Sequence, residues 1–345
     1  MEEKGRDEAA ATAPLLRAEG LFVRFYTRKG LLRRTPIHAV NGVDLTLGAG
    51  ETVALVGESG SGKTTLGRAL LRLVAPAAGT VTFDGREITA MGEGKLHWFR
   101  RRAQAVFQDP YSSINPYMTI AQIVREPLDI HGIGSHSERA VMVAKALSEV
   151  GLRPPEVFLA KYPHTLSGGQ RQRVGIARAL VVGPDLIVAD EPVSMIDASS
   201  RAEILYLLRD LQRQHRIAFL YITHDIASAR HFSDRVAVMY LGGIVEEGPP
   251  EAVIEEPLHP YAKALVEAVP EPDPSNRLRE RQVIPGEPPS PAAMPAGCPF
   301  HPRCPRSMPG ICDASKPVLR EVKPGHKVAC YLYEDAGLHY QGKKA

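Results

Sequence analysis

The stretch TVALVGESGSGKTTLGRALLRLV (residues 52–74) decides the fold of this chain. An apolar run, a glycine-rich loop and a segment with helical periodicity follow one another, which predicts a strand, a turn and a helix. The spacing G-x-x-x-x-G-K-[ST] is matched by Gly57, Gly62, Lys63 and Thr64. In this pattern backbone N–H groups surround the phosphates of a nucleotide at a helix N-terminus, the lysine adds positive charge and the threonine hydroxyl binds Mg²⁺. The stretch therefore predicts a nucleotide-binding α/β fold.

Further apolar runs place this strand in a sheet. They are TVTFDG (80–85), AQAVFQ (103–108), DLIVAD (185–190), AFLYIT (218–223) and RVAVMYLGG (235–243). Nearly continuous apolar strands that alternate with helices are typical of a mainly parallel sheet covered on both faces. Residues 111–166 lack such runs, and SERAVMVAKALSEVGL (137–152) has the spacing of an amphipathic helix. We expect a helical insert there.

Composition and charge exclude several classes of protein. The chain has 345 residues, 44% of them hydrophobic and 23% charged, and a formal charge of +3. An ordinary folded chain of about two domains has such values, and so small a positive excess predicts no nucleic-acid partner. Charged residues, glycine or proline interrupt every apolar run short of roughly 18 residues, so we expect no membrane-spanning helix. The N-terminus lacks the basic and then apolar order of a secretion signal, which favours the cytoplasm.

The run PDLIVADEP (184–192) predicts a second part of the site. Asp190 ends a buried strand, where ligands of open α/β sheets bind, so its carboxylate can hold Mg²⁺. Alternation along the strand turns Glu191 the other way, toward a water that attacks the γ-phosphate. We therefore expect hydrolysis in addition to binding.

A second glycine-rich helix start occurs in LSGGQRQRVGIARALVVGP (166–184). Exposed N–H groups and the hydroxyl of Ser167 could receive another phosphate. Because the first loop already surrounds a nucleotide, this one is interpreted as completing a site on another chain. The alternative is a glycine-rich helix start that serves packing alone.

Together these motifs are similar to those of the ATPase subunit of an ABC transporter. The chain contains, in the family's order, GESGSGKT (57–64), VFQDP (106–110), LSGGQ (166–170), IVADEP (187–192) and YITHD (221–225). The resemblance implies an α/β P-loop NTPase whose RecA-like core is a mainly parallel sheet, with a helical ABC subdomain at about 111–170. It also implies ATP and Mg²⁺ as cofactors.

The resemblance assigns a role to each site residue. The expected catalytic residues are Glu191 as the base, His224, Gln108 and Lys63. The expected Mg²⁺ ligands are Thr64, Gln108 and Asp190. Residues 167–170 match the signature motif that closes the nucleotide of the opposite protomer. The residues expected at the nucleotide are Phe25, Gly57, Ser59, Gly60, Ser61, Gly62, Lys63, Thr64, Thr65, Gln108, Ser167, Gly168, Gly169, Gln170, Asp190, Asp197 and His224.

Two positions depart from the family's usual pattern or leave a choice. An aromatic residue upstream of the phosphate-binding loop (residues 57–64) stacks on adenine in this family. LFVRFYTRKG (21–30) offers Phe25 and Tyr26, and we favour Phe25 by its position. The D-loop, usually Ser-Ala-Leu-Asp, reads Ser-Met-Ile-Asp at 194–197, which keeps the carboxylate of Asp197.

Proline usage separates the end of the chain, because 18 of the 29 prolines lie between Pro249 and Pro324. The runs PLHPYAKALVEAVP, IPGEPPSP, CPFHPRCP and GHKVACY resemble the C-terminal extension of oligopeptide and dipeptide permease ATPases. His-Pro-Tyr at 259–261 is interpreted as a helix start. The predicted organisation is a flexible tail at 1–15, an ABC ATPase domain at 16–250, a small C-terminal segment at 251–335 that contains the cysteines, and a tail at 336–345.

All four cysteines, Cys298, Cys304, Cys312 and Cys330, lie in this C-terminal segment. Four thiolates can ligate zinc or a [4Fe–4S] cluster, and the spacing alone does not choose between them. The resemblance to related permease ATPases implies the [4Fe–4S] cluster, with zinc, buried reduced thiols and disulfides as alternatives.

The function implied by the resemblance is that of the ATP-hydrolysing subunit of a di- or oligopeptide importer. Its partners would be a second ABC ATPase subunit, identical or homologous, two transmembrane permease subunits and an extracytoplasmic peptide-binding protein. It would lie peripherally on the cytoplasmic face of the cell membrane. The alternatives are the same role for nickel or an oligosaccharide, and a soluble ABC ATPase that acts outside transport.

Overall fold

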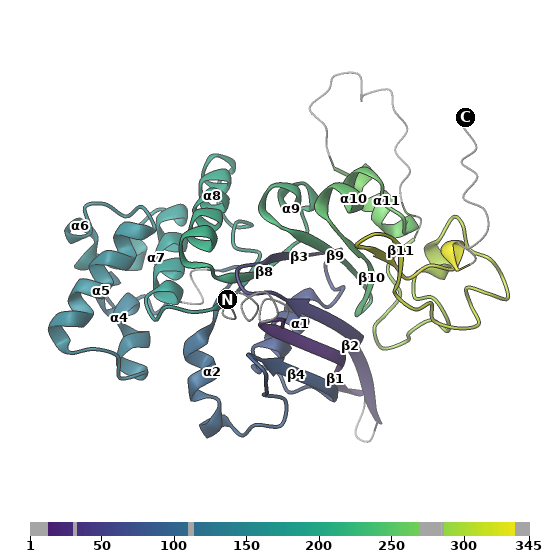
Figure 1. The fold of residues 1–345 in the computed structure, drawn as a ribbon, viewed down its shortest axis with the longest axis horizontal. Coiled ribbons are helices and arrows are strands. Elements are labelled where there is room, and N and C mark those ends of the chain that lie inside the picture. Colours follow the sequence, from purple (N-terminus) through teal and green to yellow (C-terminus); the bar gives the residue numbers. More distant parts are fainter. Residues whose placement is uncertain (1–12, 30–32, 110–113, 270–283, 285, 335–345) are drawn as a thin grey trace, which may run out of the picture.

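The computed structural model describes residues 13–29, 33–109, 114–269, 284 and 286–334 (Figure 1). The predicted tail at 336–345 and most of the tail at 1–15 lie outside the described residues. Residues 111–113 of the expected helical insert also lie outside them. Within the described residues, no helix is both long and apolar enough to cross a membrane.

The main sheet has eight strands in the order β11-β12-β10-β9-β3-β8-β7-β6. Their bounds are β3 Thr52–Val56, β6 Ala103–Val106, β7 Leu186–Asp190, β8 Ala218–Thr223, β9 Arg235–Tyr240, β10 Gly243–Gly248, β11 Arg320–Lys323 and β12 His326–Val328. Strands β6, β7, β8, β3 and β9 pair in parallel, and β10, β12 and β11 continue the sheet antiparallel. Alternate side chains of β3 enter two different apolar clusters, so both faces of the sheet are covered, as predicted.

One predicted strand belongs to a different sheet. The run at 80–85 forms part of β4 in an antiparallel sheet of order β2-β1-β4-β5. The bounds are β1 Leu16–Lys29, β2 Arg33–Leu47, β4 Ala78–Phe83 and β5 Arg86–Glu87. Val81 and Phe83 are buried and Thr82 between them is not, which is the alternation of a strand with one solvated face. Interpreting this run as part of the parallel sheet was therefore wrong.

One group of helices gathers at one end of the molecule, and the others lie around the two sheets (Figure 1). Their bounds are α1 Lys63–Leu70, α2 His97–Arg102, α4 Ile120–Ile130, α5 His136–Glu149, α6 Glu156–Leu159, α7 Gly168–Leu180, α8 Ala198–His215, α9 Ile226–Phe232, α10 Pro250–Glu255 and α11 Pro260–Glu267. Helices α4, α5, α6 and α7 gather at one end of the molecule, and α5 confirms the helix expected at 137–152. Helix α1 packs between the two sheets, because its apolar side chains share a cluster with both.

The C-terminal segment joins the main sheet through β12 and β11. Glu246 on β10 is fully buried at this junction. Its carboxylate accepts hydrogen bonds from the backbone N–H groups of Leu258, at 2.9 Å, and His259, at 2.6 Å. It also pairs with Nε2 of His326, at 2.7 Å. The segment after Gly248 is thereby fixed to the sheet that carries the phosphate-binding loop.

Candidate nucleotide-binding site

The phosphate-binding loop (residues 57–64) connects β3 to α1 in a conformation that requires glycine. Gly62 caps α1 with a φ of 104°, in the left-handed region that glycine tolerates. A Cβ atom there would lie 2.2 Å from the backbone oxygen of Ala39. At Gly57 it would lie 2.2 Å from the oxygen of Met239. Neighbouring backbone thus leaves no room for side chains, and the loop can curl tightly at the helix N-terminus.

Lys63 is buried beneath this loop, with 5% of its surface exposed. Its Nζ donates to the backbone oxygens of Gly57, at 2.7 Å, and Glu58, at 2.8 Å. Burial lowers the pKa of the ammonium group, and the charges of Glu191 and Asp190 partly oppose that shift. The ammonium group is therefore held within the loop, close to acidic groups, where an anionic ligand would find a positive charge.

Thr64 and Asp190 meet across the sheet edge. The Oγ1 hydroxyl of Thr64, on α1, donates to Oδ1 of Asp190, at the end of β7, over 3.0 Å. Burial raises the pKa of the Asp190 carboxyl above its ordinary value, because a buried carboxylate loses its water. Hard divalent cations prefer such oxygen ligands, so the residues present suit Mg²⁺.

Glu191 contacts the side chains of two other predicted catalytic residues, Gln108 and His224. Nε2 of Gln108 donates to its Oε2 over 3.0 Å, and Nδ1 of His224 lies 3.2 Å from its Oε1. The three residues follow β6, β7 and β8, which are adjacent in the sheet, so their strand ends lie at one edge. The φ of Glu191 is 47°, a left-handed conformation that is uncommon for non-glycine residues and occurs at functional sites.

The signature residues begin α7, which lies apart from α1 (Figure 1). Oγ of Ser167 accepts from the N–H of Gln170 at 3.2 Å, and the Gln170 side chain accepts from the N–H of Ser167 at 3.1 Å. Asp197 caps α8 by accepting from the N–H of Ser200 at 3.0 Å. A Cβ at Gly169 would lie 3.4 Å from Ser200, so the two helix starts are neighbours.

Phe25 and Tyr26 lie near the end of β1. Phe25 pairs with Ile37 and Tyr26 with Pro36 on β2. Both aromatic side chains are exposed, Phe25 by 42% and Tyr26 by 62%. Exposure leaves either ring accessible to a base, so the choice between them stays a prediction.

Two family matches and one relative that matches over nearly its full length identify the family of this chain. Residues 40–194 match the ABC transporter family, and residues 245–312 match the oligopeptide/dipeptide transporter C-terminal region. The YkfD protein of Bacillus subtilis (strain 168) is 47% identical over 325 residues, which cover 94% of this chain and 97% of that protein. The chain belongs to the ABC transporter family.

Other relatives agree with this membership in the ABC family. AppF, an oligopeptide transport ATP-binding protein of the same strain, is 46% identical over 313 residues, 90% of this chain and 94% of AppF. The dimeric structure of an ATP-binding cassette in a post-hydrolysis state, with ADP and phosphate, has 30% identity and a TM-score of 0.60, and the match covers 68% of this chain and 98% of that one. The structure of cbiO1 from Clostridium perfringens, part of an ABC transporter complex, has 29% identity and a TM-score of 0.62. That match covers 70% of this chain and 91% of cbiO1. The chain is accordingly an ATP hydrolase of the cassette type.

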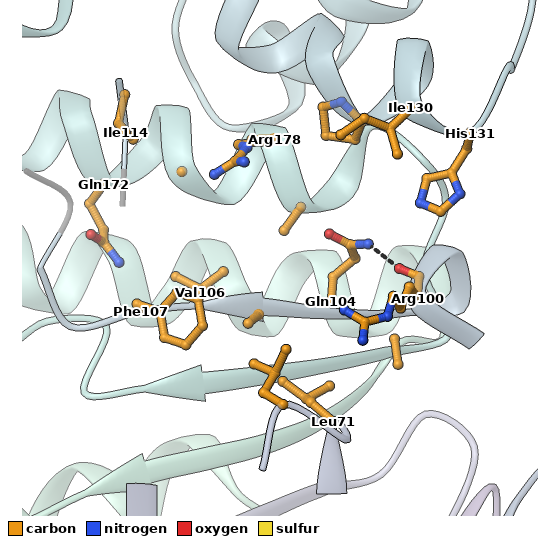
Figure 2. A pocket seen from close by; sticks show the side chains of 16 residues that line it. Leu71, Arg100, Gln104, Val106, Phe107, Ile114, Ile130, His131, Gln172 and Arg178 are labelled. Atoms are coloured by element: carbon orange, nitrogen blue, oxygen red, sulfur yellow. Dashed lines mark hydrogen bonds between the residues drawn. The ribbon is translucent and has the colours of Figure 1, made fainter. Parts of the chain in front are cut away.

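This ABC ATPase carries a groove of about 410 Å³ where its helical subdomain meets the main sheet (Figure 2). Val106 and Phe107 line one side, and side chains from the C-terminal end of α4 and from α7 line the other. Gln172 on α7 is 1% exposed. Its Nε2, like Nδ1 of His131, has no hydrogen-bond partner among the residues that the structure describes. The groove thus combines apolar walls with polar atoms that lack partners.

The cysteines of this ABC ATPase are all free thiols. The N–H of Cys298 donates to the backbone oxygen of Cys312 over 2.7 Å, so two of the thiol segments are in contact. Burial raises the pKa of the Cys298 and Cys304 thiols, and raises that of Cys330 to about 11. In the described ranges, no group of three or more His, Cys, Asp or Glu side chains could hold a metal ion. The arrangement of the described residues therefore does not support the predicted [4Fe–4S] cluster.

Sequence reasoning missed a set of contacts on Glu58 of the phosphate-binding loop. Its N–H donates to the hydroxyl of Tyr261 over 2.8 Å, and its carboxylate pairs with Arg303 at 3.1 Å. The available signals were the His-Pro-Tyr at 259–261 and an arginine between two cysteines. Neither signal predicts a contact with Glu58, which is far away in the sequence.

Proposed function

We propose that this chain is the energy-coupling ATPase of an importer for di- or oligopeptides. The observation that carries the catalytic part is the meeting of Gln108, Glu191 and His224 at one sheet edge, beside Thr64 and Asp190. The transport part is supported by the match to the oligopeptide/dipeptide transporter C-terminal region and by the name of AppF.

Within one chain, the phosphate-binding loop and Lys63 hold the triphosphate. Thr64, Asp190 and Gln108 would hold Mg²⁺, which would supply charge neutralisation at the phosphates of the nucleotide. Glu191 accepts a proton from the attacking water, and Gln108 holds the Glu191 carboxylate in place. His224, with its side chain 60% exposed, is free to contact the γ-phosphate on its other face.

A second ATPase chain, identical or homologous, completes the site. Residues 167–170 and Asp197 of that chain approach the nucleotide bound by the first. The related cassette with ADP and phosphate was solved as a dimer. Closure of the two chains then transmits the energy of ATP to two permease subunits.

The groove lined by Val106 and Phe107 is the proposed docking place for a permease. Its apolar walls suit an apolar side chain of a cytoplasmic permease loop. We propose that the ATPase lies peripherally on the cytoplasmic face of the membrane. An extracytoplasmic binding protein would deliver the peptide to the permeases.

The [4Fe–4S] cluster stays a proposal that rests on the resemblance and on the four free thiols. Anaerobically purified protein is assayed for iron and acid-labile sulfide per chain. About four of each supports the cluster. Stoichiometric zinc without sulfide favours a zinc site. If the protein contains neither iron nor zinc, the result favours buried reduced thiols.

Uptake in a strain that lacks this subunit tests the function. Labelled di- and oligopeptides, nickel and an oligosaccharide are supplied in turn, and the strain is complemented with wild type or Glu191→Gln. We expect peptide uptake to be lost and restored by wild type alone. Unchanged peptide uptake with loss of nickel or oligosaccharide uptake contradicts the substrate class. Copurification with DNA or ribosomes instead of permeases contradicts transport.

A further inference from the structure

The C-terminal segment contacts the phosphate-binding loop at Glu58. Tyr261, near the start of α11, is fully buried, and its hydroxyl accepts from the N–H of Glu58 over 2.8 Å. Burial raises the pKa of the Tyr261 phenol, so the group stays a neutral hydroxyl. A residue 203 positions away in the sequence thereby satisfies a backbone donor of the loop.

Arg303 holds the side chain of the same loop residue. Its Nη1 lies 3.1 Å from Oε2 of Glu58 and 3.4 Å from the hydroxyl of Tyr240 on β9. The Arg303 side chain is 8% exposed and that of Glu58 is 28% exposed, so water screens this pair less than an ion pair on the surface. Arg303 lies one residue before Cys304, in the cysteine-containing part of the C-terminal segment.

An aromatic cluster makes this contact rigid. The rings of Tyr240 and Tyr261 lie 4.7 Å apart between centroids, and Phe300 lies 5.2 Å from Tyr240 and 5.5 Å from Tyr261. All three side chains are less than 2% exposed. Close-packed rings resist displacement, so the positions of the Tyr261 hydroxyl and of the 300–303 turn are fixed relative to β9.

We propose that the C-terminal segment sets the geometry of the phosphate-binding loop through Glu58, with Tyr261 and Arg303 as positioning residues. The backbone oxygen of Glu58 accepts from Nζ of Lys63 over 2.8 Å. A shift of Glu58 therefore moves the ammonium group that the proposed function assigns to the phosphates. This inference rests on that proposed function and adds a control on ATP affinity from outside the loop.

Tyr261→Phe removes one hydroxyl and leaves the ring in place. Tyr333→Phe is the matched control, because the Tyr333 hydroxyl donates to the backbone oxygen of Leu258 in the same segment. We expect the KM for MgATP to rise about tenfold in Tyr261→Phe, which corresponds to loss of one hydrogen bond, with kcat within about twofold. The control keeps the wild-type KM. Equal KM values in the two variants, with similar thermal unfolding, overturn the proposal.

A double-mutant cycle tests the contact between Arg303 and Glu58. Glu58→Gln, Arg303→Gln and the double variant are compared for MgATP affinity by titration. We expect the double variant to lose about fivefold less affinity than the product of the single effects, because both substitutions remove one shared contact. Independent effects contradict the proposal. Lys63→Ala, which should bind no ATP, distinguishes this outcome from failure of the proposed ATP site itself.

Discussion

Nδ1 of His224 lies 3.2 Å from Oε1 of Glu191, and the two side chains differ in exposure, 60% for His224 and 19% for Glu191. The carboxylate is thus enclosed while the imidazole keeps an open face. Such an arrangement lets one residue act on a confined water molecule while the other reaches a ligand that arrives from solvent.

Substitution Glu191→Gln should stop turnover and preserve ATP binding. The amide cannot accept the proton of the attacking water, while Lys63, Thr64 and Asp190 are unchanged. We expect a fall in kcat of about 10²-fold or more and a stable closed dimer in the presence of MgATP, seen by size-exclusion chromatography. Undiminished turnover, after contaminating ATPase is excluded, removes Glu191 from the role of base.

Substitution His224→Ala should lower kcat by about 10²–10⁴-fold with a small change in ATP affinity, because the lost contacts are those of the γ-phosphate and Glu191. The control is His231→Ala on α9, where the described contact of His231 is through its backbone oxygen with Arg209. Steady-state ATPase assays compare the two. A loss of activity in both variants would point to general damage near α9 instead of a role for the His224 side chain.

Asp190→Asn should stabilise the ligand-free protein at neutral pH and abolish its stabilisation by MgATP. Burial raises the pKa of Asp190, so folding favours the protonated form. Stability is therefore lost as pH rises through the folded pKa, and an uncharged amide avoids that loss. We expect the unfolding midpoint of Asp190→Asn in EDTA to exceed that of wild type by about 2 °C or more at pH about 8, and by less at pH about 4. A lower midpoint at both pH values contradicts this.

The buried His259 should make the protein sensitive to acid. It caps α11 by accepting from the N–H of Tyr261 at 3.1 Å, and burial lowers its pKa to about 3. The unfolded chain binds a proton at the ordinary value of about 6.5, so stability is complete above that pH and falls as pH drops toward 3. His259→Asn keeps a capping acceptor without the titration. The free energy of unfolding, measured with urea between these pH values, should fall less steeply with decreasing pH in the variant than in the wild type. Equal slopes would exclude His259 as the source of the acid sensitivity.

Local sequence patterns predict the parts of the site that lie close together in the chain. Residues 57–64 give both the loop and the start of α1, and Asp190 and Glu191 end a buried strand. Periodicity and turn residues carry this information directly. Gln108 and His224 were expected at the site from the family resemblance, and they join it because β6, β7 and β8 are parallel neighbours, an order that the sequence patterns did not predict.

Contacts between distant parts of the chain carry no such signal. Glu58 meets Tyr261 and Arg303 across 203 and 245 positions, and hydrophobic periodicity does not encode a partner at that distance. The run at 80–85 was misinterpreted for a related reason. Its apolar character predicts a strand, while the sheet it joins depends on pairing with β1.

The pairing of β12 with β10 has a consequence for biosynthesis. Glu246 and His326 lie 80 positions apart, and every ATP-binding motif precedes both. Because the ribosome delivers the chain from the N-terminus, a nascent molecule exposes the free edge of β10 until its partner strand emerges. Open strand edges recruit other chains. A product truncated before His326 would therefore retain all of its nucleotide motifs and still tend to aggregate, so genetic truncation of this region should be interpreted as a defect of maturation before it is interpreted as a defect of catalysis.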